Sequence, residues 1–158
     1  MDILKLVKEK EEKVIKIRRD LHQIPELELE LPKTMEYISK VLDEIGVNYK
    51  KLVNGNAIVV QIDGEQKGKC IAIRADSDAL PVVEETGLPF ASTNGNMHAC
   101  GHDGHTAMAL GACMILNENR DKLKGTVKIF FQPGEETPGG ALPMIEEGCM
   151  ENPKVDAV

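Results

Sequence analysis

The residue types best suited to chemistry are concentrated in the nine residues from Met97 to His105. Three of the four histidines and one of the four cysteines of the chain lie there. Cys100 and His102 flank a glycine, whose conformational freedom lets the backbone turn tightly enough for both side chains to face one point. A thiolate and an imidazole are good ligands for zinc and related divalent metals. This spacing predicts a metal site, against the alternative of a loop with polar histidines and a small buried cysteine.

Other residues of this stretch have less certain roles. We expect Cys100 to have a lowered thiol pKa, because it lies shortly before the positive N-terminal end of a predicted helix. For His98, metal ligation and a structural role remain equal alternatives. His105 is predicted to lie within the helix, where a structural or substrate-contacting role is at least as plausible as ligation.

Two pairs of carboxylates follow apolar runs that predict strands. Glu135 and Glu136 are adjacent, so in an extended chain their side chains project oppositely, and one can bind a metal while the other faces a water. Metal-assisted hydrolysis needs this division, because the cation lowers the pKa of water to about 7 and a free carboxylate takes the proton. Asp76 and Asp78 are predicted to face the same side, where either could ligate the metal or orient a ligand. The alternatives are a solvated surface pair for the glutamates and an ordinary turn for the aspartates.

The elements that must position these residues follow from hydrophobic periodicity. Helices are predicted over residues 3–23, 32–45, 106–116 and 140–147, the third of them buried on nearly every side. Strands are predicted over 47–53, 57–62, 70–75 and 125–131, with another beginning at 155. The runs 70–75 and 125–131 are apolar enough for central strands. Residues 79–96 form a long loop of the kind that often has a function.

This order of elements predicts an α/β layered domain with a mixed or largely parallel sheet. In such sheets ligands gather beyond the carboxyl ends of the strands, where both acidic pairs lie. Arg18, Arg19 and His22 form a cationic cluster at the end of the first helix, for which we favour a structural role.

Composition restricts the function classes. The 158 residues suit one soluble domain, with 42% hydrophobic and 28% charged residues. Only 3% are aromatic and the net charge is -7, which disfavours nucleic acid as a partner. We find neither a signal peptide nor an apolar run of roughly 20 residues, so we expect a cytoplasmic protein that is not bound to a membrane. Its four cysteines are then expected to be reduced thiols.

Four ordered segments resemble the successive signatures of the M20 metallopeptidase family. They are residues 18–34 (RRDLHQIPELELELPKT), 74–81 (RADSDALP), 98–105 (HACGHDGH) and 132–136 (QPGEE). The similar subgroup comprises amidohydrolases of N-acyl amino acids, such as those related to hippurate hydrolase. Gly134 stands where many members have Ala, and Ser77 where Met is common, and neither difference affects the chemistry.

The resemblance implies roles for individual residues. Cys100, His102 and Glu136 would be ligands of a two-metal centre holding zinc, manganese, nickel or cobalt. Glu135 would be the general base and acid, and Asp78 would orient the site, with Asp76 near the metals. The implied reaction is hydrolysis of the amide bond of N-acyl amino acids or small peptides by a metal-activated water.

The resemblance also implies that residues 1–158 form the amino-terminal portion of a layered α/β/α zinc-peptidase-like catalytic domain, incomplete at its C-terminus. Two further histidine ligands of the family, and the lid domain through which its members form homodimers, have no counterpart here. We therefore expect the chain alone to be inactive or impaired. The competing hypothesis is a non-catalytic fragment or subdomain that binds metal weakly or assembles with a separate remainder.

Overall fold

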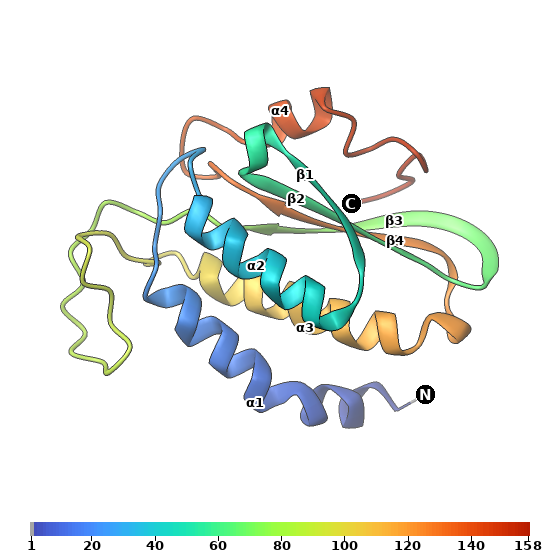
Figure 1. Cartoon of the computed structure of the whole chain (residues 1–158), viewed down its shortest axis with the longest axis horizontal. Helices are drawn as coiled ribbons and strands as arrows, with labels where there is room; N and C mark the ends of the chain where they lie inside the picture. The colour runs from blue at the N-terminus through green and yellow to red at the C-terminus, as the bar shows by residue number, and fades with distance from the viewer. Residues whose placement is uncertain (1) are drawn as a thin grey trace.

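The computed structural model describes residues 2–158, which form one mixed four-stranded sheet with helices on both faces (Figure 1). The elements in chain order are α1 (Ile3–His22), α2 (Pro32–Ile45), β1 (Asn48–Leu52), the short 3-10 helix η1 (Val53–Gly55), β2 (Ala57–Asp63), β3 (Gln66–Asp76), α3 (His102–Glu118), the 3-10 helix η2 (Arg120–Lys122), β4 (Lys124–Gln132) and α4 (Ala141–Glu146). The predicted α/β layered class is confirmed.

The sheet order is β1-β2-β4-β3. The pairings β1–β2 and β2–β4 are antiparallel, whereas β3 and β4 run parallel. The sheet is therefore mixed, with its parallel part confined to the two strands that precede the acidic pairs.

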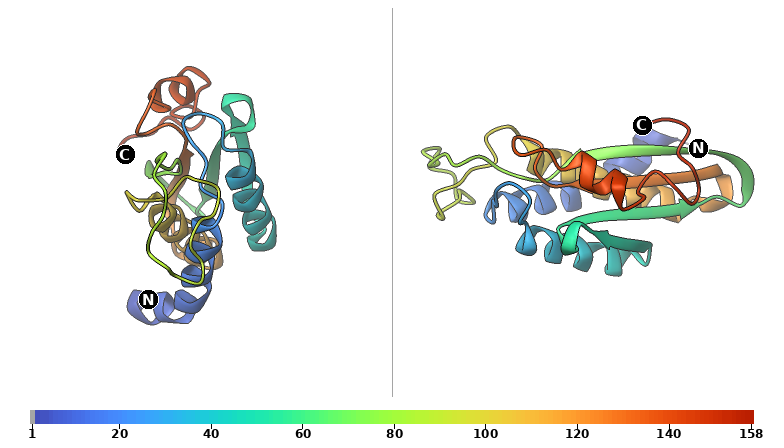
Figure 2. Two further views of the ribbon diagram at one scale, coloured as in Figure 1. Left: turned by 90° about the vertical axis from the view of Figure 1, so that its left-hand side faces the viewer. Right: turned by 90° about the horizontal axis from the view of Figure 1, so that it is seen from above.

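Alternation of side chains along the strands separates two apolar clusters. Ile129 and Phe131 on β4 belong to the main core beneath α1, α2 and α3. Phe130 between them belongs to a smaller cluster with Met144 of α4 and Cys149. Figures 1 and 2 show the corresponding layers, with α1, α2 and α3 on one face of the sheet and α4 with the C-terminal segment on the other.

The boundaries of α2 follow local sequence signals. Pro32 is the first helical residue, where its missing N–H costs no hydrogen bond. Gly46 ends the helix in the left-handed conformation, at φ 73°, and its N–H bonds to the carbonyl oxygen of Leu42. Both are local signals that a short stretch of sequence supplies.

Two expectations about burial are wrong. The run 70–75 was predicted to be a central strand, but among the described strands β3 lies at the edge of the sheet, and its Ile71 and Ile73 are exposed. Its outer side carries a parallel bridge from Ile71 to Ala157, which lies in the run predicted to begin a strand at 155. The helix predicted over 106–116 begins four residues earlier, at His102, and is not buried all round, because Met108 is exposed. The run 125–131, by contrast, is a central strand as predicted.

The parallel pairing of β3 with β4 positions the candidate site. Asp76 lies opposite Gln132 in the register, and the N–H of Ser77 donates to the carbonyl oxygen of Gln132 at 2.9 Å. The carboxyl ends of parallel strands meet at one edge, so residues 76–78 and 132–136 emerge side by side. Within residues 2–158, no helix combines the length and the apolarity needed to cross a membrane.

Candidate metal centre

His102 lies at the middle of the site. It is the first residue of α3 and is buried. Its Nδ1 lies 2.9 Å from the backbone carbonyl oxygen of Asp78. A carbonyl only accepts hydrogen bonds, so Nδ1 donates this one, and Nε2 is the ring nitrogen left to bind a cation. Nε2 then faces three carboxylates, at 3.6 Å from Asp76, 3.7 Å from Glu135 and 3.8 Å from Glu136.

Cys100, His102 and Glu136 place one potential ligand atom each within 4.8 Å of one another. Cys100 is exposed, whereas the other three cysteines are buried. The pKa of its thiol is raised, first through its hydrogen bond with the Glu136 carboxylate and further by burial and neighbouring negative charges. The expected lowering of this pKa by the helix end is therefore wrong, because the neighbouring carboxylates raise it. A bound cation would favour the thiolate.

Glu135 and Glu136 lie in a turn rather than in the strand, which corrects the prediction that their side chains project oppositely. Gly134 begins the turn at φ 62°, a conformation that suits glycine. The wholly buried carboxylate of Asp78 accepts the backbone N–H groups of Glu135 at 3.0 Å and Glu136 at 3.1 Å. Both glutamate carboxylates consequently face the Nε2 atom of His102.

Asp76 and Asp78 approach opposite sides of the same imidazole. Asp76 is near Nε2, whereas Asp78 is near Nδ1, with its Oδ1 at 3.5 Å. The carboxylate of Asp76 also lies 2.6 Å from Nδ1 of His105 and 2.8 Å from a guanidinium nitrogen of Arg74. Asp76, His102 and His105 form a second potential metal-binding group, which shares His102 with the first. In this second group Asp76 already has two partners, Arg74 and His105.

His98 and His105 differ in their surroundings. The ring of His105 stacks on that of His102, with centroids 5.7 Å apart, and is half exposed. His98 is buried, and neither of its ring nitrogens has a hydrogen-bond partner among the described residues. Burial lowers the pKa of His98 to about 4, so it is neutral near pH 7. His98 belongs to neither potential metal-binding group found among residues 2–158.

Three residues near the site were not singled out by sequence reasoning. Arg74 pairs with Asp76, while Asp103 and Glu84 are wholly buried carboxylates that both contact His22. The position of Asp103 next to the candidate ligand His102 is a sequence signal that could have pointed to it. Glu84 lies in the long loop, where nothing in the local composition distinguishes it from a solvated glutamate.

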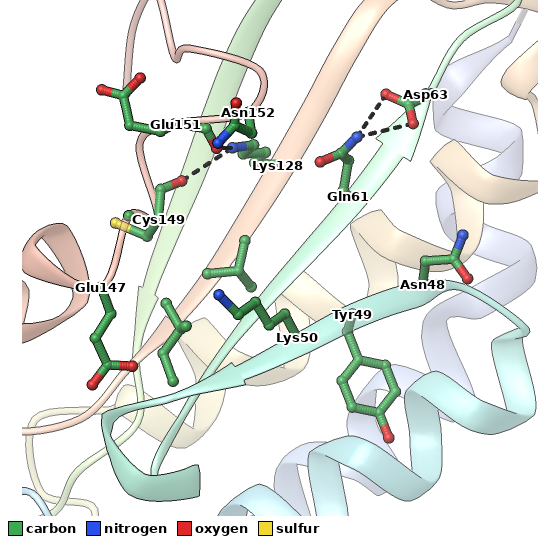
Figure 3. Close-up of a pocket in the computed structure, with 13 residues that line it drawn as sticks. Asn48, Tyr49, Lys50, Gln61, Asp63, Lys128, Glu147, Cys149, Glu151 and Asn152 are labelled. Atoms are coloured by element: carbon green, nitrogen blue, oxygen red, sulfur yellow. Dashed lines mark hydrogen bonds between the residues drawn. The ribbon is translucent and has the colours of Figure 1, made fainter.

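A separate hollow of about 450 Å³ lies on the face of the sheet that carries α4 (Figure 3). Its lining includes Lys50, Gln61 and Lys128, and none of the residues predicted to do chemistry. The buried ammonium of Lys128 donates to the carbonyl oxygens of Cys149 at 3.2 Å and Glu151 at 2.6 Å. Lys128 thus fastens the segment after α4 to the sheet.

The donor set around His102 fits a divalent cation. Zinc bonds of about 2.0–2.3 Å in a tetrahedral site place ligand atoms roughly 3.3–3.8 Å apart. The separation of 3.8 Å between His102 Nε2 and Glu136 Oε1 falls at the upper end of that range. The Nε2 atom of His102 and the carboxylates concentrated around it are groups that a cation would bind together.

Fold and site together define an α/β protein with a potential metal-binding cluster of cysteine, histidine and carboxylate side chains at the ends of two parallel strands. Residues 72–158 match the model of peptidase family M20/M25/M40. The chain belongs to this family, as its motifs predicted.

Its relatives are named as hydrolases. The chain is 48% identical over 149 residues to N-acetyl-L-cysteine deacetylase from Bacillus subtilis (strain 168), covering 94% of this chain and 35% of that protein. It is 43% identical to N-acyl-L-amino acid amidohydrolase from Geobacillus stearothermophilus, covering 99% of this chain and 42% of the relative. The chain thus spans less than half the length of these relatives.

A solved structure agrees with these matches. The crystal structure of the Bacillus subtilis YXEP protein, a dinuclear metal binding peptidase from the M20 family, superposes with a TM-score of 0.86 at 44% identity. The match covers 90% of this chain and 41% of that one. The layered α/β architecture is therefore that of M20 peptidase domains.

Proposed function

We propose that this chain takes part in metal-dependent hydrolysis of the amide bond of N-acyl amino acids or small peptides. Cys100, His102 and Glu136 would hold the cation, Glu135 would act as general base and acid, and Asp78 would orient the site. The observation that carries the proposal is the Nε2 atom of His102, which points away from the Asp78 carbonyl and lies within 3.8 Å of three carboxylates. The names of the relatives, a deacetylase and an amidohydrolase, support the substrate class.

The positions of Glu135 and Asp78 suit them to different roles in this reaction. When bound, a divalent cation would polarise the amide carbonyl and make water more acidic. Glu135 is the more exposed of the two glutamates, with 40% of its side chain accessible against 27% for Glu136. It is therefore better placed to take a proton from water and deliver it to the leaving amine. The buried Asp78 holds the backbone of both glutamates, so that these two roles are kept at fixed positions.

The proposal extends to a two-metal centre, to residues 1–158 as the amino-terminal portion of the catalytic domain, and to homodimerisation through a lid domain. A dinuclear metal centre is named for the YXEP protein. The described residues of this chain would contribute three ligands to such a centre.

The test combines metal analysis with turnover. The purified protein should bind zinc, manganese, nickel or cobalt, and Cys100→Ser should weaken that binding. Glu135→Gln should abolish hydrolysis of N-acetyl and N-benzoyl amino acids while leaving metal content unchanged, because it removes the base and no ligand. Glu146→Gln, at an exposed glutamate of α4, is the matched control and should leave both unchanged. Hydrolysis that survives in Glu135→Gln would refute its role, and a chain that binds metal without turnover would favour a non-catalytic metal-binding fragment.

A further inference from the structure

His22, the last residue of α1, is buried between two carboxylates from distant parts of the chain. Its Nδ1 lies 2.7 Å from Oδ2 of Asp103, and its Nε2 lies 3.2 Å from Oε1 of Glu84. Both carboxylate side chains are wholly buried. Asp103 is the second residue of α3, and Glu84 belongs to the loop that joins β3 to α3. One imidazole therefore links α1, the loop and the start of α3.

Each of the two carboxylates has further partners that fix it in place. Asp103 accepts Nε of Arg18 at 2.8 Å and the backbone N–H of Gly104 at 2.9 Å. Glu84 accepts the hydroxyl of Thr86 and the backbone N–H of Ser92 at 2.6 Å. The pKa of Glu84 is lowered to about 2, chiefly by the bond from Thr86. Glu84 is thus held ionised at neutral pH, and each of the two carboxylates is fixed in position by several partners.

The contacts of His22 with Asp103 and Glu84, here called the His22 linkage, are covered on the loop side by the aromatic ring of Phe90. It packs edge-on against His22, with centroids 5.7 Å apart, and the guanidinium groups of Arg18 and Arg19 lie 5.5 and 5.1 Å from its centre. The cationic cluster at the end of α1 therefore does not face solvent alone. It is the surface onto which the long loop folds.

This linkage lies directly behind the candidate ligands. Asp103 adjoins His102, and Cys100 lies in the turn before α3, outside any regular element. The turn is held by short-range bonds, including those from the N–H groups of Gly104 and His105 to the carbonyl oxygen of Gly101. Its position relative to the strand ends depends on what anchors the loop and the first turn of α3. His22 contacts both, the loop through Glu84 and the first turn of α3 through Asp103.

We propose that His22 is a positioning residue for the metal centre, which joins Asp103 and Glu84 so that Cys100 and His102 are held in ligand geometry before a cation binds. The inference rests on the proposed function in taking Cys100 and His102 as ligands. Groups that orient metal ligands from behind typically contribute about 10–100-fold in metal affinity when removed. If the ligands are already ordered before the cation binds, binding loses less conformational entropy and the metal affinity is higher.

The test compares His22→Gln with Val60→Ala, a core truncation in β2 that removes buried apolar volume without touching the linkage. In the metal-free protein, hydrogen exchange of the amides of residues 101–105 should speed up at least about tenfold in His22→Gln and stay unchanged in Val60→Ala. In Co²⁺ titrations, the thiolate-to-cobalt absorption band from Cys100 should require about 10–100-fold more metal in His22→Gln only. Glu84→Gln, which keeps one acceptor oxygen, should shift both readouts in the same direction by less, and it replaces His22→Gln if that variant does not fold.

Equal effects in His22→Gln and Val60→Ala would show that His22 contributes only general stability and would overturn the inference. Unchanged exchange and unchanged cobalt affinity in His22→Gln would overturn it as well. A wild-type protein without any cobalt–thiolate band would instead refute the metal assignment of the proposed function. In that case the exchange rates would still decide whether His22 orders residues 101–105.

Discussion

Replacement of Asp78 by alanine removes the carboxylate that accepts two backbone N–H groups of the Glu135–Glu136 turn. These bonds are 3.0 and 3.1 Å long, and the side chain is wholly buried. A hydrogen bond to a charged group contributes about 1.5–3 kcal/mol to stability, so the loss of both predicts a fall of about 3–6 kcal/mol in the free energy of unfolding. Asp78→Asn keeps one acceptor oxygen and turns an NH₂ group toward the other N–H, so it should cost about half as much.

Urea denaturation of the two variants measures these differences directly. Asp121→Asn, at an exposed aspartate of η2, is the control for loss of a negative charge and should change stability by less than about 0.5 kcal/mol. Asp78→Asn should remain folded. Its rate of hydrolysis should nevertheless fall, because the turn that presents Glu135 and Glu136 loses one of its two hydrogen bonds to residue 78. A cost below about 1 kcal/mol for Asp78→Ala would refute the reasoning that this carboxylate organises the turn.

Three further predictions concern other parts of the molecule. The pKa of His98 is about 4 in the folded chain against 6.5 for a free imidazole, so the unfolded chain takes up the proton first and stability falls as the pH drops from about 6.5 to 4. The fall from this group should be about 3 kcal/mol, and urea unfolding of His98→Gln between pH 7.5 and 4 should show a correspondingly flatter dependence. Gly125→Ala should cost more than about 2 kcal/mol, because Gly125 has φ +88° and the added Cβ would lie 2.0 Å from the carbonyl oxygen of Lys69, whereas Gly87→Ala, also at positive φ but in open space, should cost about 1 kcal/mol. Phe131→Ala should cost about 3–5 kcal/mol in thermal or urea unfolding, because Phe131 is wholly buried in the main core.

Much of the fold could be predicted because its signals are local. The proline and glycine that bound α2, and the apolar run of β4, act through backbone geometry and burial that a short stretch of sequence determines. The edge position of β3 could not be read in the same way. An apolar run reports that a strand avoids water, but which strand lies beside it depends on pairing between residues far apart in the chain.

The candidate site divides along the same line. Cys100 and His102 could be proposed as ligands because these residue types lie close together in the sequence, and Asp78 could be proposed as a site residue because it follows an apolar run. The clustering of Glu135 and Glu136 on one side of His102 was not predictable, since the turn that creates it depends on Asp78, more than fifty residues away. Glu84 was missed for a similar reason, because its burial arises only when the loop folds onto α1.

His102 belongs to both potential metal-binding groups, so the two groups cannot each use its imidazole at the same time. Its Nδ1 is committed to a backbone carbonyl, so only Nε2 can bind a cation, and a nitrogen lone pair binds one cation at a time. The two groups therefore compete for the one cation that His102 can bind, and a second cation of a two-metal centre would have to be held without this imidazole. Loss of Cys100 would then move the cation bound by His102 toward Asp76 and His105.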